Sequence, residues 1–180
     1  ELLNLYDEYG FMMLEEIPLN WWGNKWDMTS IGGKEEQSFN ILDQAKSTLT
    51  DMIARDKNHP CIIIWSMANE CATDNEVGIT VMRELLKLTK SLDPTRLATF
   101  VAGGDPEKHL GFDEADIVCF NEYFICDHIS QLDSAVYDHL SRDLALARSN
   151  FPNKPIVITE FGRQGIKGIH GDAFYSEEFQ

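Results

Sequence analysis

Cys61-Ile62-Ile63-Ile64-Trp65-Ser66-Met67-Ala68-Asn69-Glu70 is a dense apolar run that ends abruptly in an amide and a carboxylate. The same pattern returns far downstream as Pro155-Ile156-Val157-Ile158-Thr159-Glu160-Phe161-Gly162. A short continuous apolar run that is bounded by polar or turn-forming residues is typical of a strand buried on both faces. The sequence therefore predicts two buried strands, each of which ends in a carboxylate.

Helical and strand patterns alternate along the rest of the chain. Apolar residues at helical spacing predict helices over residues 2–9, 38–57, 76–92 and 132–147, and a further helix that begins near residue 175. Shorter apolar runs predict strands over 11–14, 97–101 and 116–123. Thr73 and Glu76 have the spacing of a capping box at the start of the third helix. Residues 19–37 are expected to form a long irregular segment.

This alternation indicates an α/β fold with a parallel sheet covered by helices. In a closed (β/α)8 barrel the carboxyl ends of the strands form the active-site face, whereas an open sheet gathers ligands near one switch point. Polar residues at the ends of four strands favour a TIM barrel, present here as a partial barrel. These strand-end residues are Glu15, Glu16, Asn69, Glu70, Asn121, Tyr123 and Glu160.

The composition narrows the range of partners and cofactors. The 180 residues carry a net charge of −15, which argues against nucleic acid or an anionic membrane as a partner. No apolar run approaches the ~20 residues of a membrane span. Glycine-rich nucleotide-binding motifs are absent from the sequence, so we expect no nucleotide cofactor.

The four cysteines predict neither a disulfide framework nor a metal centre. They are Cys61, Cys71, Cys119 and Cys126, and no CxxC pair occurs among them. Cys126-Asp127-His128 is a possible fragment of a metal site, but the sequence offers no second cluster of ligands. We therefore expect no metal and no cofactor.

Paired carboxylates at strand ends suggest acid–base chemistry. A single strand-end glutamate is equally well explained by a salt bridge to a neighbouring helix. For Glu70 and Glu160 together, with Asn69 and Tyr123 beside them, a carboxylate pair with divided roles is the better explanation. In retaining glycoside hydrolysis such carboxyl groups lie about 5–5.5 Å apart. Tryptophans in the irregular segment either bind a sugar ring or pack the loop, and these alternatives stay open: Trp21, Trp22 and Trp26.

At these residues the chain resembles the (β/α)8 catalytic domain of glycoside hydrolase family 2, and within it most closely the β-glucuronidases. The resemblance covers essentially the whole chain. Its Asn-Glu segment, with the Asp-Lys-Asn-His-Pro lead-in, is highly specific for the family. The matching segments are residues 54–60, 65–70, 92–96, 158–162, 168–170 and 176–180.

The resemblance implies a retaining exo-β-glycosidase, with a β-glucuronide as its carbohydrate substrate. Glu70 would be the general acid/base, Glu160 the nucleophile, and Asn69 a partner of the sugar 2-hydroxyl. Tyr123 would steady the nucleophile. Glu15 stands where the family has an aspartate that contacts the sugar, and the Asn-x-Lys element that grips the glucuronate carboxylate lies beyond Gln180 by analogy. The further residues expected to bind substrate are Asn121, Glu15 and Trp22.

The resemblance also implies a larger enzyme. Residues 1–180 would be part of one barrel, about strands 3 to 7, preceded by β-sandwich domains, with the first two strands and the last strand outside this chain. A homo-oligomer is expected for the full-length protein. The beginning of the chain does not have the pattern of a signal peptide. If the protein is bacterial, we expect a cytoplasmic location.

Three alternatives remain at this point. A β-galactosidase or another family 2 exo-β-glycosidase differs only in the sugar that it accepts. A non-catalytic carbohydrate-binding barrel would have no need for both Glu70 and Glu160. A metal-dependent barrel hydrolase would require a histidine cluster, which the sequence pattern does not reveal.

Overall fold

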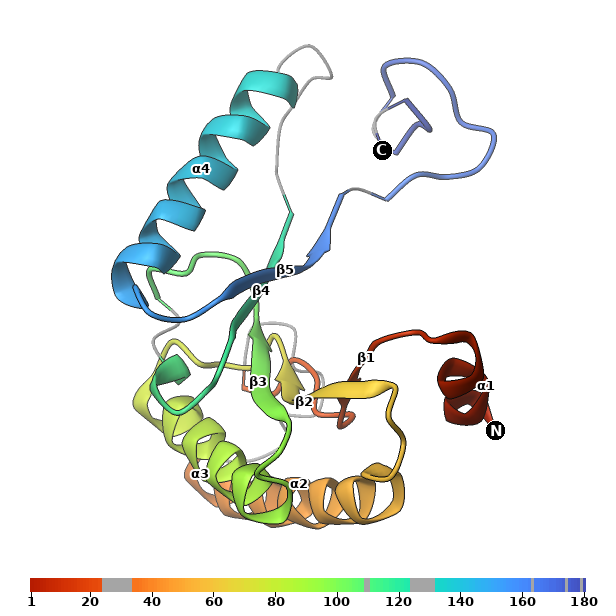
Figure 1. Cartoon of the computed structure of the whole chain (residues 1–180). Coiled ribbons are helices and arrows are strands. Elements are labelled where there is room, and N and C mark those ends of the chain that lie inside the picture. Colours follow the sequence, from red (N-terminus) through yellow and green to blue (C-terminus); the bar gives the residue numbers. More distant parts are fainter. Residues whose placement is uncertain (24–33, 109–110, 124–131, 163, 174, 179) are drawn as a thin grey trace.

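The computed structural model describes residues 1–23, 34–108, 111–123, 132–162, 164–173, 175–178 and 180. Helices and strands alternate along the chain (Figure 1). No helix in these described ranges is both long enough and apolar enough to cross a bilayer. The elements are α1 Leu2–Tyr9, β1 Met13–Glu16, α2 Lys34–Asp56, β2 Ile62–Asn69, α3 Glu76–Leu92, β3 Leu97–Ala102, the 3-10 helix η1 Gly111–Asp113, β4 Val118–Glu122, α4 Leu132–Asn150 and β5 Ile156–Phe161.

The five strands form one parallel sheet in the order β1-β2-β3-β4-β5. In Figure 1, α2 and α3 lie side by side against the first three strands, and α4 connects β4 to β5. Sequential parallel strands with crossover helices are the arrangement of a TIM barrel. The prediction of an α/β partial barrel is confirmed.

Apolar residues lie on both faces of the sheet. The larger core fills the space between the sheet and the helices, where Trp65 and Met67 of β2 and Leu85 of α3 are fully buried. A smaller cluster lies on the opposite face of the strands, and it consists of Val101, Ile117 and Cys119 with Ile64 packed against them. Burial on both faces explains why the strands have continuous rather than alternating apolar patterns.

The segment after α3 fastens β2 and β3 to the helical layer. Asp93 accepts hydrogen bonds from the Trp65 indole at 3.0 Å and from Arg96 at 2.7 Å, and Arg96 also donates to the Ile62 carbonyl at 2.6 Å. Burial acts to raise the pKa of Asp93, but hydrogen bonds from Thr95, Arg96 and Trp65 outweigh it and hold the pKa well below its usual range. Residues 92–96, one of the segments that match the family, therefore hold β2 and β3 against the helices and have a structural role.

The first strand begins later than predicted. Residues 11–14 were expected to form it, but β1 is Met13–Glu16, and Phe11 and Met12 are exposed. Gly10 ends α1 in the left-handed conformation, the Phe11 amide donates to the Tyr6 carbonyl at 3.0 Å, and the two rings lie 5.5 Å apart. Phe11 therefore belongs to the helix cap, which apolar periodicity alone does not distinguish from a strand.

Two helix starts also differ from the prediction. Helix α2 begins at Lys34, so the segment expected to be irregular is shorter. Helix α3 is capped by Asn75, whose side chain accepts from the Gly78 amide at 3.0 Å, and not by Thr73. A Cβ at position 78 would lie 1.7 Å from the Ala72 carbonyl oxygen, so the first turn packs directly on the preceding backbone. Val77, in the first turn of the helix, is exposed.

The helix expected near residue 175 is also wrong. Residues 175–178 form a turn in which Tyr175 has a φ of 67°, a value that no α-helix contains. The Ile166 amide donates to the Tyr175 carbonyl at 2.8 Å, and the Glu177 amide donates to the Ile169 carbonyl at 2.8 Å. These non-local hydrogen bonds fold the end of the chain back on residues 166–169.

Candidate active site

A cavity of about 720 Å³ opens at the carboxyl ends of the strands. It brings together Glu70, which follows β2, and Glu160 on β5, together with Asn69 and Tyr123. The remaining described residues that line it are Asn20, Trp21, Phe161, Gln164 and Tyr175. Four of the seven predicted site residues therefore share one cavity.

Two neutral donors hold the carboxylate of Glu70. The Asn121 side-chain amide donates to one oxygen at 2.8 Å, and the Trp21 indole donates to the other at 2.8 Å. Asn121 is fully buried and its own carbonyl oxygen accepts from the Thr159 hydroxyl at 2.8 Å. Because both oxygens of Glu70 are engaged, the plane of its carboxyl group is fixed.

The backbone around Glu70 turns sharply into the cavity. Glu70 has a φ of 50°, a left-handed conformation that is uncommon for residues other than glycine. Its amide donates to the Val101 carbonyl at 2.8 Å, and residues 19–21 pair with Asn69 on the other side. Strain of this kind persists where surrounding structure determines it, and it is frequent at active sites.

Tyr123, the residue that follows β4, forms a hydrogen bond with the second carboxylate, that of Glu160. Its hydroxyl donates a hydrogen bond to Glu160 Oε2. This hydrogen bond, together with partial burial and the charges of Glu160 and Glu70, raises the pKa of Tyr123 to about 12. The phenol thus stays protonated at neutral pH and remains a donor to Glu160.

Asn121 does not contact the cavity, contrary to its predicted role in binding substrate. Its amide reaches both Glu70 and Asn69 Oδ1, the latter at 3.0 Å, and its exposed fraction is zero. The Asn69 amide in turn donates to Asn20 at 2.8 Å. From its buried position, Asn121 thus orients the side chains of Asn69 and Glu70.

Trp22 is also not a cavity residue. It is 9% exposed and belongs to the apolar core, whereas its neighbour Trp21 lines the cavity. Trp21 has a φ of 57°, and the Trp22 carbonyl accepts from the Ala72 amide at 2.9 Å, so the turn directs the two rings apart. Two adjacent tryptophans carry no sequence signal for which one faces the ligand. Trp26 lies outside the described residues.

Glu15 lies on the wrong face of β1 to bind substrate. Its carboxylate is 3.6 Å from Arg55 of α2, while the next residue, Glu16, accepts from the Ser66 hydroxyl at 2.7 Å. Burial raises the pKa of Glu16, and the charge of Glu160 adds to this effect. Because side chains alternate along a strand, only Glu16 points to the side of Glu160.

Glu15→Gln in the full-length protein is expected to raise the free energy of unfolding at pH 8 by on the order of 1 kcal/mol. Burial is the largest cause that raises the pKa of Glu15 from 4.5 to about 7, and Asp56 adds to it. The folded state then binds more protons than the unfolded state between these values, so stability falls as pH rises through this window. Glutamine cannot ionise and escapes this loss. Urea unfolding at pH 4, 6 and 8 measures the effect, and an identical pH dependence in both proteins would contradict it.

Several cavity residues have no recognisable signal in the sequence. Gln164 and Tyr175 reach the cavity from the segment that follows β5. That segment has no periodic pattern, and its position depends on hydrogen bonds between distant residues. The three cysteines in the described part of the chain, Cys61, Cys71 and Cys119, are buried and form no disulfide with one another. The fragment Cys126-Asp127-His128 lies outside the described residues.

The chain is similar in sequence and structure to glycoside hydrolases. A family model described as glycosyl hydrolases family 2, TIM barrel domain, matches residues 1–180. The β-glucuronidase of Mus musculus is 33% identical over 190 residues, covering all of this chain and 26% of the mouse protein. A β-D-glucuronidase structure from Dictyoglomus thermophilum has a TM-score of 0.86 at 32% identity, covering 99% of this chain and 31% of that one.

A third relative has a different sugar in its name. The β-galacturonidase from Eisenbergiella tayi, bound to galacturonate, has a TM-score of 0.80 at 29% identity, covering 99% of this chain and 30% of that one. The chain thus spans less than a third of each of these relatives. The match of the family model over the whole chain establishes the family. The chain belongs to glycosyl hydrolase family 2, as part of its TIM barrel domain.

Proposed function

We propose that the whole protein is a retaining exo-β-glycosidase that hydrolyses terminal β-glucuronides, with Glu160 as nucleophile and Glu70 as general acid/base. One observation carries the proposal that these two residues perform the chemistry. Two carboxylates face the same cavity from different strands, and among the described residues they accept hydrogen bonds from the neutral side chains of Trp21, Asn121 and Tyr123. A carboxylate that served only to anchor a helix would be paired with a cation, as Glu15 is with Arg55.

In the first step the ionised Glu160 attacks the anomeric carbon, while Glu70 transfers its proton to the departing glycosidic oxygen. The C–O bond to the aglycone breaks as the ester to Glu160 forms. The Tyr123 hydroxyl holds Glu160 at its Oε2, which orients the carboxylate for attack. Trp21 and Asn121 hold the two oxygens of Glu70, which fixes the direction of proton transfer.

In the second step Glu70 accepts a proton from water, and the resulting hydroxide adds to the anomeric carbon as the ester to Glu160 breaks. The two displacements together retain the β configuration. Asn69 lines the same cavity beside Glu70 and supplies an amide for the sugar 2-hydroxyl. Hydrogen bonds to this hydroxyl strengthen in the transition state and contribute to the rate.

The choice of a glucuronide rests on the relatives named β-glucuronidase and on the chemistry of the uronate carboxylate. This carboxylate would need a cationic partner, but the described residues that line the cavity include no lysine or arginine. The Asn-x-Lys element that the family resemblance implies beyond Gln180 would supply this partner. The β-sandwich domains, the remaining barrel strands and a homo-oligomeric state stay predictions.

A panel of p-nitrophenyl β-glycosides on the full-length protein tests the substrate assignment. We expect kcat/KM for the β-D-glucuronide to exceed that for the β-D-glucoside at least about 10³-fold, because the two sugars differ only in the charged group that a dedicated site reads. The β-D-galacturonide tests the sugar configuration of the E. tayi relative, and the β-D-galactoside tests the alternative of a β-galactosidase. Preference for either neutral sugar would contradict the glucuronide assignment while leaving the roles of Glu70 and Glu160 intact.

A further inference from the structure

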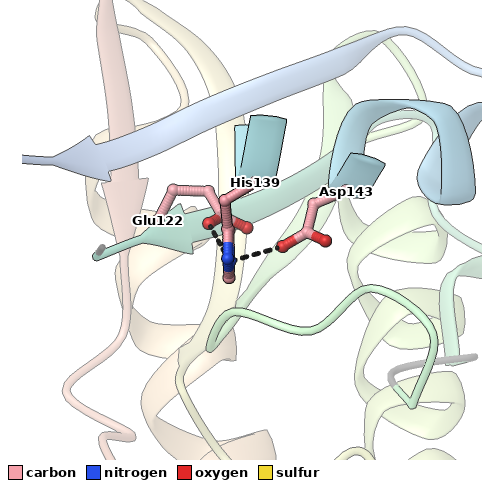
Figure 2. A group of neighbouring side chains, drawn as sticks. All are labelled: Glu122, His139 and Asp143. Carbon is pink, nitrogen blue, oxygen red and sulfur yellow. Dashed lines mark ion pairs between the residues drawn. The ribbon is translucent and has the colours of Figure 1, made fainter. Parts of the chain in front are cut away.

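A second cluster of ionisable side chains lies outside the active-site cavity, between β4 and α4. Glu122 is the last residue of β4, and His139 and Asp143 are four residues apart on α4 (Figure 2). The His139 Nε2 atom lies 3.7 Å from Glu122 Oε2 and 3.0 Å from Asp143 Oδ2. One histidine nitrogen thus lies between two carboxylates that come from different elements.

Burial makes this cluster unusual. Glu122 and Asp143 are each 1% exposed, and Glu122 Oε1 has no hydrogen-bond partner among the described residues, whereas Asp143 Oδ2 has the ion-pair contact with His139 at 3.0 Å. Buried carboxylate oxygens without a partner are costly, and the great majority in folded proteins are satisfied. One guanidinium, that of Arg142, reaches the other oxygen of Asp143 at 2.8 Å. With a neutral histidine and both carboxyl groups ionised, the cluster keeps a net negative charge; burial and the neighbouring Asp143 accordingly raise the pKa of Glu122 to about 7.

We propose that Glu122, His139 and Asp143 bind a divalent transition-metal cation of the Zn²⁺ type. One imidazole nitrogen and two carboxylate oxygens are ligands that such cations accept. The three candidate ligand atoms all lie within 4.8 Å of one another. Ligand atoms of a tetrahedral zinc are spaced by roughly 3.4 Å, so small side-chain rotations bring the three into place.

A cation explains the cluster better than a protonated histidine alone. The Nε2–H group of a protonated His139 can form a well-aligned hydrogen bond with only one of the two carboxylates. It would also leave Glu122 Oε1 without a partner. A divalent ion bound by all three residues neutralises both buried charges at once, and it gives each carboxylate a ligand at about 2 Å.

The position of the cluster indicates a structural role. Glu122 stands between Asn121, which holds Glu70, and Tyr123, which holds Glu160. A metal ion would fasten α4 to this end of β4 without entering the active-site cavity, since none of its three ligands lines that cavity. The inference is thus independent of the proposed activity.

The test uses the full-length protein after chelator treatment, with Zn²⁺ and Mn²⁺ as probes. Calorimetric titration is expected to give one equivalent of Zn²⁺ or Mn²⁺ per chain that Glu122→Gln lacks or binds at least about tenfold more weakly. Glu122→Gln removes a buried unpaired charge with little change of shape, so it is expected to fold. It should raise the melting temperature of the metal-free protein while abolishing the further rise that the metal causes. Asp143→Asn should likewise lose the metal response.

Asp138→Asn is the matched control, because Asp138 is exposed on the same helix and is not part of the cluster. It should bind the ion as the parent protein does. Equal binding by the parent protein and Glu122→Gln would overturn the proposal, as would the absence of any binding by the parent protein. The activity of the glycosidase enters none of these readouts.

Discussion

Glu160→Gln in the full-length protein is expected to lower kcat by at least about 10⁴-fold while leaving the fold intact. The amide keeps the shape of the side chain and can still accept from Tyr123, but it cannot form the covalent ester. Steady-state kinetics on an aryl β-glucuronide measure the loss, and circular dichroism checks the fold. Near-normal turnover would rule out Glu160 as the nucleophile.

Glu15→Gln is the matched control for this loss. Glu15 also lies near the carboxyl end of a strand, but its side chain faces α2 and Arg55 rather than the cavity. Its substitution is therefore expected to leave kcat within about twofold of the parent enzyme. If Glu15→Gln lost activity as Glu160→Gln does, the loss would reflect the negative charge at this end of the sheet and would not identify Glu160 as the nucleophile.

Glu70→Ala is expected to reduce kcat/KM by about 10²–10⁴-fold for substrates whose aglycone is a poor leaving group. The loss should be much smaller for a dinitrophenyl glycoside, because that leaving group departs without a proton. Kinetics across a series of aryl glycosides therefore separate an acid/base from a binding residue. A uniform loss across the series would contradict the acid/base role of Glu70.

Azide distinguishes the two carboxylates by stereochemistry. In Glu70→Ala azide is expected to attack the ester on Glu160 and to give the β-glycosyl azide. In Glu160→Ala it should displace an activated leaving group directly and give the α-glycosyl azide. The anomeric configuration of each product follows from proton NMR. Interchanged anomers would mean that the roles of the two residues are reversed.

The order of elements could be read from the sequence because the central strands β2 to β4 consist largely of buried residues. Continuous apolar runs such as Ile62–Trp65 are unambiguous when helices with a clear stripe separate them. The carboxyl ends of parallel strands necessarily meet at one end of the sheet. The convergence of Glu70 and Glu160 in one cavity follows from this topology alone.

Side-chain direction at strand ends could not be read in the same way. Glu15 and Glu16 are adjacent carboxylates on opposite faces of β1, and the continuous apolar run before them does not show which face lines the barrel interior. A shift of one residue moves every side chain of a strand to the other face. The structure therefore assigned Glu16, and not Glu15, to the side of the cavity.

The remaining surprises depend on contacts between distant segments. Trp21 reaches Glu70 because the chain after β1 pairs with the end of β2, and no local pattern encodes that pairing. His139 and Asp143 are four residues apart on one helix, and only the fold brings the buried Asp143 to Glu122 of β4. Sequence spacing can indicate that His139 and Asp143 lie together on one helix, but it cannot show that Glu122, on a strand, lies beside them.

Trapping of the glycosyl-enzyme tests the central claim most directly. The full-length protein is incubated with a 2-deoxy-2-fluoro-β-glucuronyl fluoride, which slows hydrolysis of the ester, and then digested with trypsin. The peptide of residues 149–163 contains Glu160 as its one acidic residue. The account predicts that mass spectrometry finds the fluoroglucuronyl label on this peptide. A label on a peptide that contains Glu70 or Glu16 instead, or an active enzyme that acquires no label, would contradict it.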